Sequence, residues 1–201
     1  MEELKPLSKI FELDERMAGF PWMVKSDHQR LSEINLPEDA PEDIRDYFVT
    51  IKNICLYGRF AYAFYGVAWS LTFPLMELAL RERFNPGKGG GKGDFRRLLQ
   101  KAIKLGLLKE EGFSHIRRIR QHQVEMRALF DETGVAPFQS EGTEAYLKIL
   151  EETMPKLRNL FAHPQHQAIV LPQESLFAIG FAAEFINQLY AGGATRLRSQ
   201  T

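Results

Sequence analysis

The feature that most constrains this chain is a long row of apolar residues at helical spacing, which begins after Pro41 and continues to Phe84. Residues three, four or seven positions apart share one helix face, so the row predicts a long amphipathic helix. Its first members are Ile44, Phe48, Ile51, Cys55, Tyr62, Tyr65 and Trp69, with Gly58 in the remaining slot. Pro74 should kink or restart the helix, because proline lacks an N–H and clashes with the preceding turn. We expect this helix to be the spine of a helical bundle.

Other segments also show helical spacing, and none alternates apolar and polar residues as a half-buried β-strand would. We expect helices at residues 95–105, 114–130, 143–152 and 174–190, and a further one that begins at Thr153 or Pro155. Asp94 should cap the start of the first of these helices, and Gly106 should end it. A short helix at 4–18 should precede an extended arm at 20–41. The sequence thus predicts an all-α fold, a bundle of six or seven helices. Its expected parts are an N-terminal arm (1–41), a helical domain (42–191) and a flexible tail (192–201).

Residues 60–76 carry no charge, and this run is slightly shorter than the ~20 residues that usually cross a membrane. Small and polar residues interrupt it, so we interpret it as a buried core or dimer helix rather than a membrane span. The first residues lack the basic and then apolar pattern of a signal peptide. Cys55 is the only cysteine, which excludes an intramolecular disulfide and fits a reducing compartment. We therefore expect a cytoplasmic protein without membrane partners.

The formal net charge is zero, but basic residues are concentrated between positions 92 and 128. Two helices expected there would each carry a basic face, and such a face can follow a nucleic-acid backbone. The candidate RNA-binding residues are Arg96, Arg97, Lys101, Arg117, Arg118 and Arg120. His115 and His122 lie on the second of these helices and could also contact phosphate. The alternative is that all these side chains form ordinary solvated helix faces, with Ile116 and Ile119 directed inward.

Several other chemistries lack the residues they need. The glycine-rich loop at 85–93 has Pro86 where a phosphate-binding loop requires glycine, and Gly93 where it requires Ser or Thr. His163 and His166 are separated by a proline, and no nearby cysteine or carboxylate completes a zinc site. Cys55 lies in an apolar run, where we expect an unreactive thiol. We therefore expect neither a metal nor a cofactor.

The most informative short motif lies at residues 154–164, Met-Pro-Lys-Leu-Arg-Asn-Leu-Phe-Ala-His-Pro. Its apolar residues, Met154, Leu157, Leu160 and Phe161, have the spacing of one helix face. Pro164 disfavours helical dihedrals in the residue before it, so the helix should end near Ala162 or His163. Arg158, Asn159 and His163 would then lie in the last turns, where their polar groups can surround an anion.

The order Arg158-Asn159-x-x-x-His163 resembles the signature motif of HEPN domains, which are small all-helical modules of prokaryotic defence and toxin proteins. The resemblance implies a HEPN-like fold over roughly residues 42–190. It also implies a homodimer in which two copies of the motif face one cleft and cut RNA without a metal. An antitoxin or another partner protein is a further implication. HEPN proteins often add a polar residue from an earlier helix, for which Glu77 is the candidate here.

Transesterification at an RNA phosphate defines a role for each motif residue. Histidine exchanges protons near neutral pH, so His163 is the expected proton-transfer group. Arg158 would stabilise the negative charge on the phosphorane oxygens, and Asn159 would orient the imidazole or the phosphate. Arg158 and His163 are five residues apart, about 140° around an ideal helix. The helix must therefore unwind at Pro164, or the partner chain must complete the site.

Two alternatives remain open at this point. An arginine and a histidine near a helix C-terminus can simply bind its last carbonyl groups. The chain would then be a non-catalytic HEPN-like module that dimerises and binds a nucleotide or a protein partner. Likewise, Glu77 and Arg81 are one helical turn apart and can form an ordinary intrahelical ion pair.

Overall fold

The computed structural model describes residues 4–17, 19, 23–86, 94–133, 146–162 and 170–191. Seven α-helices and three short 3-10 helices lie in these ranges, and no β-strand does. The predicted all-α helical bundle is therefore confirmed for this part of the chain. Residues 87–93 of the glycine-rich loop, His163, His166 and the tail at 192–201 lie outside the described residues, so the expectations made for them stay predictions.

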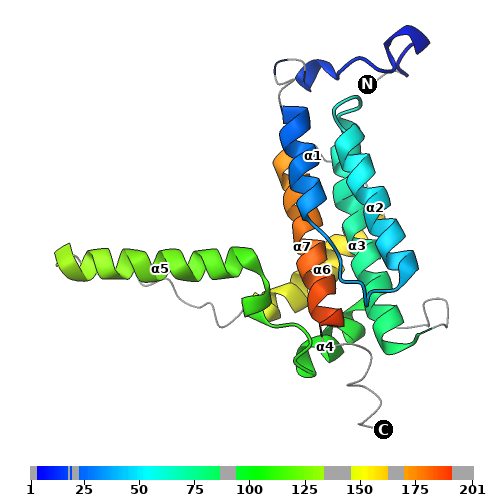
Figure 1. Ribbon diagram of the computed structural model, residues 1–201. Coiled ribbons are helices and arrows are strands. Elements are labelled where there is room, and N and C mark those ends of the chain that lie inside the picture. Colours follow the sequence, from blue (N-terminus) through cyan, green and yellow to red (C-terminus); the bar gives the residue numbers. More distant parts are fainter. Residues whose placement is uncertain are drawn as a thin grey trace.

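Four helices run along one another and form the body of the bundle (Figure 1). They are α1 (Met23–Glu33), α2 (Glu42–Tyr57), α3 (Ala63–Phe84) and α7 (Pro172–Tyr190). α3 is central, because it packs against α2 and α7 and also contacts α4 and α6. Its residues Ala68, Leu75, Ala79 and Leu80 are completely buried. α3 therefore has the role of the predicted spine.

The predicted long helix is divided in two, which corrects the sequence-based expectation. α2 ends at Tyr57 and α3 begins at Ala63, and the two helices pack against each other. Gly58 allows this close turn, since a Cβ atom at that position would lie 2.8 Å from the Tyr65 ring. Gly58 was expected to continue the apolar row. Its true role depends on a contact that the spacing of the row does not reveal.

α3 is the one helix in the described ranges that is long and apolar enough to cross a membrane, judged by length and composition alone. Half of its apolar window is buried inside the bundle, against the neighbouring helices. Pro74 lies within α3, and the helix continues through it without restarting. The packing of α2 and α7 on α3 compensates for the one backbone hydrogen bond that proline cannot donate.

The N-terminal residues are more ordered than an extended arm. Residues 4–17 contain two 3-10 turns, Leu7–Lys9 and Glu15–Met17, in place of the predicted short helix. Residues 23–33 form α1, so the expectation of an extended segment is wrong there. Leu31 joins the core, and the Asp27 carboxylate binds the Arg59 guanidinium at 2.5 Å. These long-range contacts hold α1 on the bundle.

Three further helices complete the fold: α4 (Phe95–Lys104), α5 (Ser114–Thr133) and α6 (Tyr146–Ala162). The predicted start and end of α4 are confirmed, because the Asp94 side chain accepts the Arg96 N–H and Gly106 has a φ of 67°. α4 packs against α3 and α6 at one end of the bundle, whereas α5 projects away from it (Figure 1). Ile119 on α5 is half exposed, which contradicts its predicted inward position.

α6 is a single helix where two were expected. Pro155 lies inside it and not at a helix start. The buried residues Leu150 and Met154 lie one turn apart on the face that packs against the bundle, and this burial favours one continuous helix through the proline.

Candidate functional site

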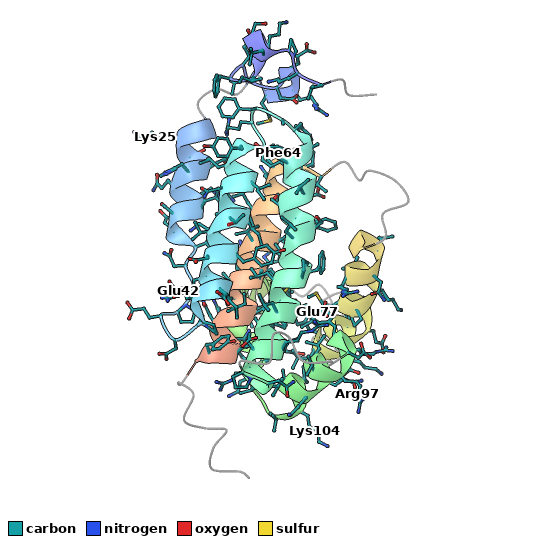
Figure 2. The ribbon with its side chains drawn as sticks, turned by 90° about the vertical axis from the view of Figure 1, so that its right-hand side faces the viewer. Lys25, Glu42, Phe64, Glu77, Arg97 and Lys104 are labelled. Carbon is teal, nitrogen blue, oxygen red and sulfur yellow. The ribbon has the colours of Figure 1, made fainter. Side chains whose placement is uncertain are left out.

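Glu77 is a buried carboxylate on the central helix, at the point where α6 crosses α3 (Figure 2). Only 5% of the residue is exposed. Its neighbours Phe73, Met76 and Leu80 on α3 belong to the core, so Glu77 interrupts an apolar surface. A buried carboxylate is costly unless charged or polar partners bind it. Its partners are therefore the key to the site.

Two arginines bind this carboxylate, one oxygen each. Arg81, one turn further along α3, donates from Nη2 to Oε1 at 2.5 Å. Arg158 on α6 donates from Nε to Oε2 at 2.8 Å. The predicted intrahelical ion pair is thus confirmed, and it forms only half of a three-residue cluster that links α3 to α6.

The inward direction of Arg158 follows from its place on α6. Leu150, Met154 and Arg158 are spaced by four residues, so the arginine continues the buried row of the helix. Leu160, expected in the apolar stripe, is more than half exposed. The buried face of the motif helix therefore differs from the predicted one, and it includes Arg158 in place of Leu160.

Asn159 lies beside Arg158 and accepts a hydrogen bond from it. The Arg158 Nη1 donates to the Asn159 Oδ1 at 3.2 Å, and the Asn159 side chain is exposed. A guanidinium has five N–H donors, of which this bond and the bond to Glu77 use two. Asn159 thus contacts the arginine of the motif directly.

The cluster keeps an excess of positive charge near the surface. Two guanidinium groups share one carboxylate, so the three side chains together carry a formal charge of +1. The side chain of Glu77 is 7% exposed, whereas those of Arg81 and Arg158 are 31% and 35% exposed. The negative charge therefore lies inside and the arginines reach solvent, an arrangement that can bind an anion from outside.

His163 follows the last residue of α6, Ala162, and lies outside the described residues. The predicted approach of His163 to Arg158 and Asn159 therefore stays a prediction. The structure does bring together Arg158, Asn159 and Glu77, the three other predicted site residues. Arg81 was predicted only as an intrahelical partner of Glu77, and its place in a cluster that also holds Arg158 was not predicted.

The basic residues predicted to contact RNA fall into two groups. Arg96, Arg97 and Lys101 are exposed on α4, which packs against both helices of the cluster; Figure 2 labels Arg97. Lys101 also lies over the Phe84 ring, 4.4 Å from its centroid. A hydrogen bond of 2.7 Å between Gln100 and Glu151 joins α4 to α6. The first group is therefore attached to the same part of the bundle.

The second group, on α5, is engaged differently. Arg120 forms ion pairs with Glu110 and Glu111, and Arg117 donates to the Glu111 carbonyl at 2.6 Å. Arg118 is exposed. α5 projects away from the bundle, whereas α4 packs against α3 and α6 (Figure 1).

His115 is not a fully solvated residue of α5. Its ring packs among aromatic rings, at 5.1 Å from Tyr146 and 5.5 Å from Phe177, measured between centroids. Burial lowers the pKa of His115, because desolvation disfavours the charged imidazolium. His122, in contrast, is exposed. The aromatic contacts make His115 part of a packed cluster rather than of an open basic face.

The two remaining candidate chemistries concern metals and the thiol. Within the placed residues, no group of three or more His, Cys, Asp or Glu side chains could hold a metal ion. Cys55 is buried as predicted, and burial raises its pKa to about 11. A thiol with so high a pKa is a poor nucleophile at neutral pH.

Comparisons with known proteins returned no relative: no protein-family model, no curated protein and no solved structure matches the chain. The site consists of a buried carboxylate, two arginines about one-third exposed and an asparagine, on two packed helices.

Proposed function

We propose that the protein is a HEPN-type endoribonuclease that cuts RNA by 2′-hydroxyl transesterification without a metal. The observation that carries this proposal is the 2.8 Å bond from Arg158 to Glu77. A motif arginine held by a buried acid from another helix has a fixed position, and fixed donors stabilise a transition state better than mobile ones.

The reaction requires one attack and two proton transfers. The 2′-oxygen forms a bond to the adjacent phosphorus, and the bond from phosphorus to the 5′-oxygen breaks. The 2′-hydroxyl loses its proton, and the departing 5′-oxygen gains one. In a homodimer, one His163 accepts the first proton and the His163 of the partner subunit donates the second. The products carry a 2′,3′-cyclic phosphate and a 5′-hydroxyl.

Arg158 binds the phosphate oxygens, whose negative charge increases as the phosphorane forms. Glu77 is a positioning residue that acts through Arg158. It does not cancel the positive charge, because it is shared between Arg158 and Arg81. Asn159 restricts the guanidinium further by accepting from its Nη1.

The exposed residues Arg96, Arg97 and Lys101 on α4 would bind neighbouring RNA phosphates, since α4 packs against both helices of the cluster. A dimer places two such surfaces beside two motifs. A cytoplasmic role in phage defence or as a toxin, with an antitoxin as partner, fits an enzyme that cuts cellular RNA.

The test is RNA cleavage in the presence of EDTA, with the product ends identified. Wild-type protein should leave 2′,3′-cyclic phosphate, whereas His163→Ala and Arg158→Ala should each lower the rate by about 10²–10³ or more. Lys156→Ala, which removes an exposed cation from the same helix, is the matched control and should retain activity.

Absence of cleavage by wild-type protein over a broad RNA panel would refute the enzyme. Cleavage that Arg158→Ala leaves intact would refute the role of the cluster. If the protein also forms a folded dimer without cutting RNA, the non-catalytic module is the better description.

A further inference from the structure

A pocket of about 410 Å³ lies between α1, α5 and α7, and it contains neither Glu77, Arg81 nor Arg158. Its size falls within the ~300–1,000 Å³ of small-molecule sites. The segments that form it are far apart in sequence, as Arg30, Arg118 and Phe177 illustrate. The pocket is therefore a product of the fold and is independent of the proposed ribonuclease site.

Gly180 leaves part of the pocket wall without a side chain. It lies on α7 between Phe177 and Glu184, on the face that lines the pocket. A Cβ atom at Gly180 would meet only the Ile34 Cδ1, at 4.0 Å. The missing side chain therefore leaves space where an ordinary residue would fill the wall.

The wall of the pocket offers an aromatic surface. Phe177 is 53% exposed, and Phe181 lies one turn further along α7. Their rings are nearly parallel, at an angle of 23°. His115 packs behind both rings and supports them. A planar ligand can stack on this supported surface.

Charge at the pocket favours an anion. Arg30 from α1 and Arg118 from α5 are both exposed, and neither forms an ion pair within the ranges that the structure describes. Glu184 already accepts the Ser114 N–H, at 3.1 Å from each oxygen. The two guanidinium groups therefore outnumber the one engaged carboxylate.

We infer that this pocket binds a small aromatic anion. The ring of the ligand stacks on Phe177 beside Gly180, and its carboxylate or phosphate group binds Arg30 and Arg118 by charge-assisted hydrogen bonds. The aromatic surface and the arginine pair line the same pocket, and the two together define this class of ligand.

The inference is tested by calorimetric titration of the full chain with phenyl phosphate, benzoate, inorganic phosphate and phenol. One of the aromatic anions should bind at least about tenfold more tightly than phosphate or phenol, since each of these lacks one of the two contacts. The first two probes distinguish a phosphate from a carboxylate ligand. Arg118→Gln and Arg30→Gln should each weaken binding by about tenfold or more.

Arg117→Gln is the matched control, because this exposed arginine of α5 does not line the pocket and should leave binding unchanged. Gly180→Met should abolish binding by filling the pocket, and Gly180→Ala, verified as folded by its melting curve, should weaken it. No saturable binding of either aromatic anion up to about 10 mM would overturn the inference. Equal binding of inorganic phosphate, or equal losses in Arg117→Gln and Arg118→Gln, would also overturn it.

Discussion

Asp27 and Glu77 are both buried carboxylates that bind arginine, but the exposure of the bound arginines differs between the two regions. At the Asp27–Arg59 pair both side chains are enclosed, with exposures of 7% and 1%. At the Glu77 cluster the carboxylate is equally buried, but Arg81 and Arg158 reach solvent. The first arrangement satisfies its charges internally and attaches α1 to the bundle. The second leaves both arginine side chains about one-third exposed at the surface.

The largest effect should come from breaking the enclosed pair. Arg59→Gln leaves Asp27 charged in a buried position, so the free energy of unfolding should fall by about 3–5 kcal/mol. Urea denaturation of wild type and variant measures the change. A loss below about 1 kcal/mol would show that the pair is not a structural element.

A smaller loss is expected at the turn next to this pair. Gly58→Ala places a Cβ atom 2.8 Å from the Tyr65 ring, and overpacking of this kind costs about 1–3 kcal/mol. The melting temperature provides the measurement. The double variant Gly58→Ala, Tyr65→Leu, which removes the ring from the contact, should recover part of the loss, and no recovery would contradict the clash.

The corresponding change in the Glu77 cluster should have little effect on stability. Arg158→Gln leaves Glu77 bound to Arg81, and the lost arginine is partly exposed, so we expect about 1 kcal/mol or less. Urea denaturation of Arg158→Gln and Arg59→Gln under the same conditions compares the losses in free energy of unfolding in the two regions. Equal losses would mean that Arg158 is as structural as Arg59.

The smallest effect at neutral pH concerns Cys55, close to the enclosed pair. Because its folded pKa is raised from 9.0 to about 11, the unfolded thiol loses its proton first as pH rises. Stability should therefore decrease between pH 9 and 11, and less so in Cys55→Ala. Below pH 8 a thiol reagent should label Cys55 only after unfolding; rapid labelling of the native protein would contradict its burial.

Sequence reasoning identified features that depend on neighbouring residues. The Asp94 cap, the glycine at the end of α4 and the Glu77–Arg81 pair were all predicted, since each involves residues within a few positions. The break between α2 and α3 was missed, because it depends on Gly58 meeting Tyr65 and on Arg59 meeting Asp27. Helical spacing alone continued through it.

The site shows the same division. The motif supplied Arg158 and Asn159, but the contact from Arg158 to Glu77 spans 81 positions, and only the family resemblance suggested Glu77. Arg30 and Arg118 meet at one pocket because α1 is a helix, where the sequence suggested an extended arm. Such long-range contacts are the part that one sequence does not reveal.

We propose that Glu77 serves RNA cleavage by positioning Arg158. The most direct test is a double-mutant cycle on single-turnover RNA cleavage in EDTA, with Glu77→Gln, Arg158→Ala and the double variant. If Glu77 acts through Arg158, the double variant should be no slower than Arg158→Ala alone, and Glu77→Gln alone should still be impaired. Fully additive losses, or a Glu77→Gln variant as fast as wild type, would contradict this positioning role of Glu77.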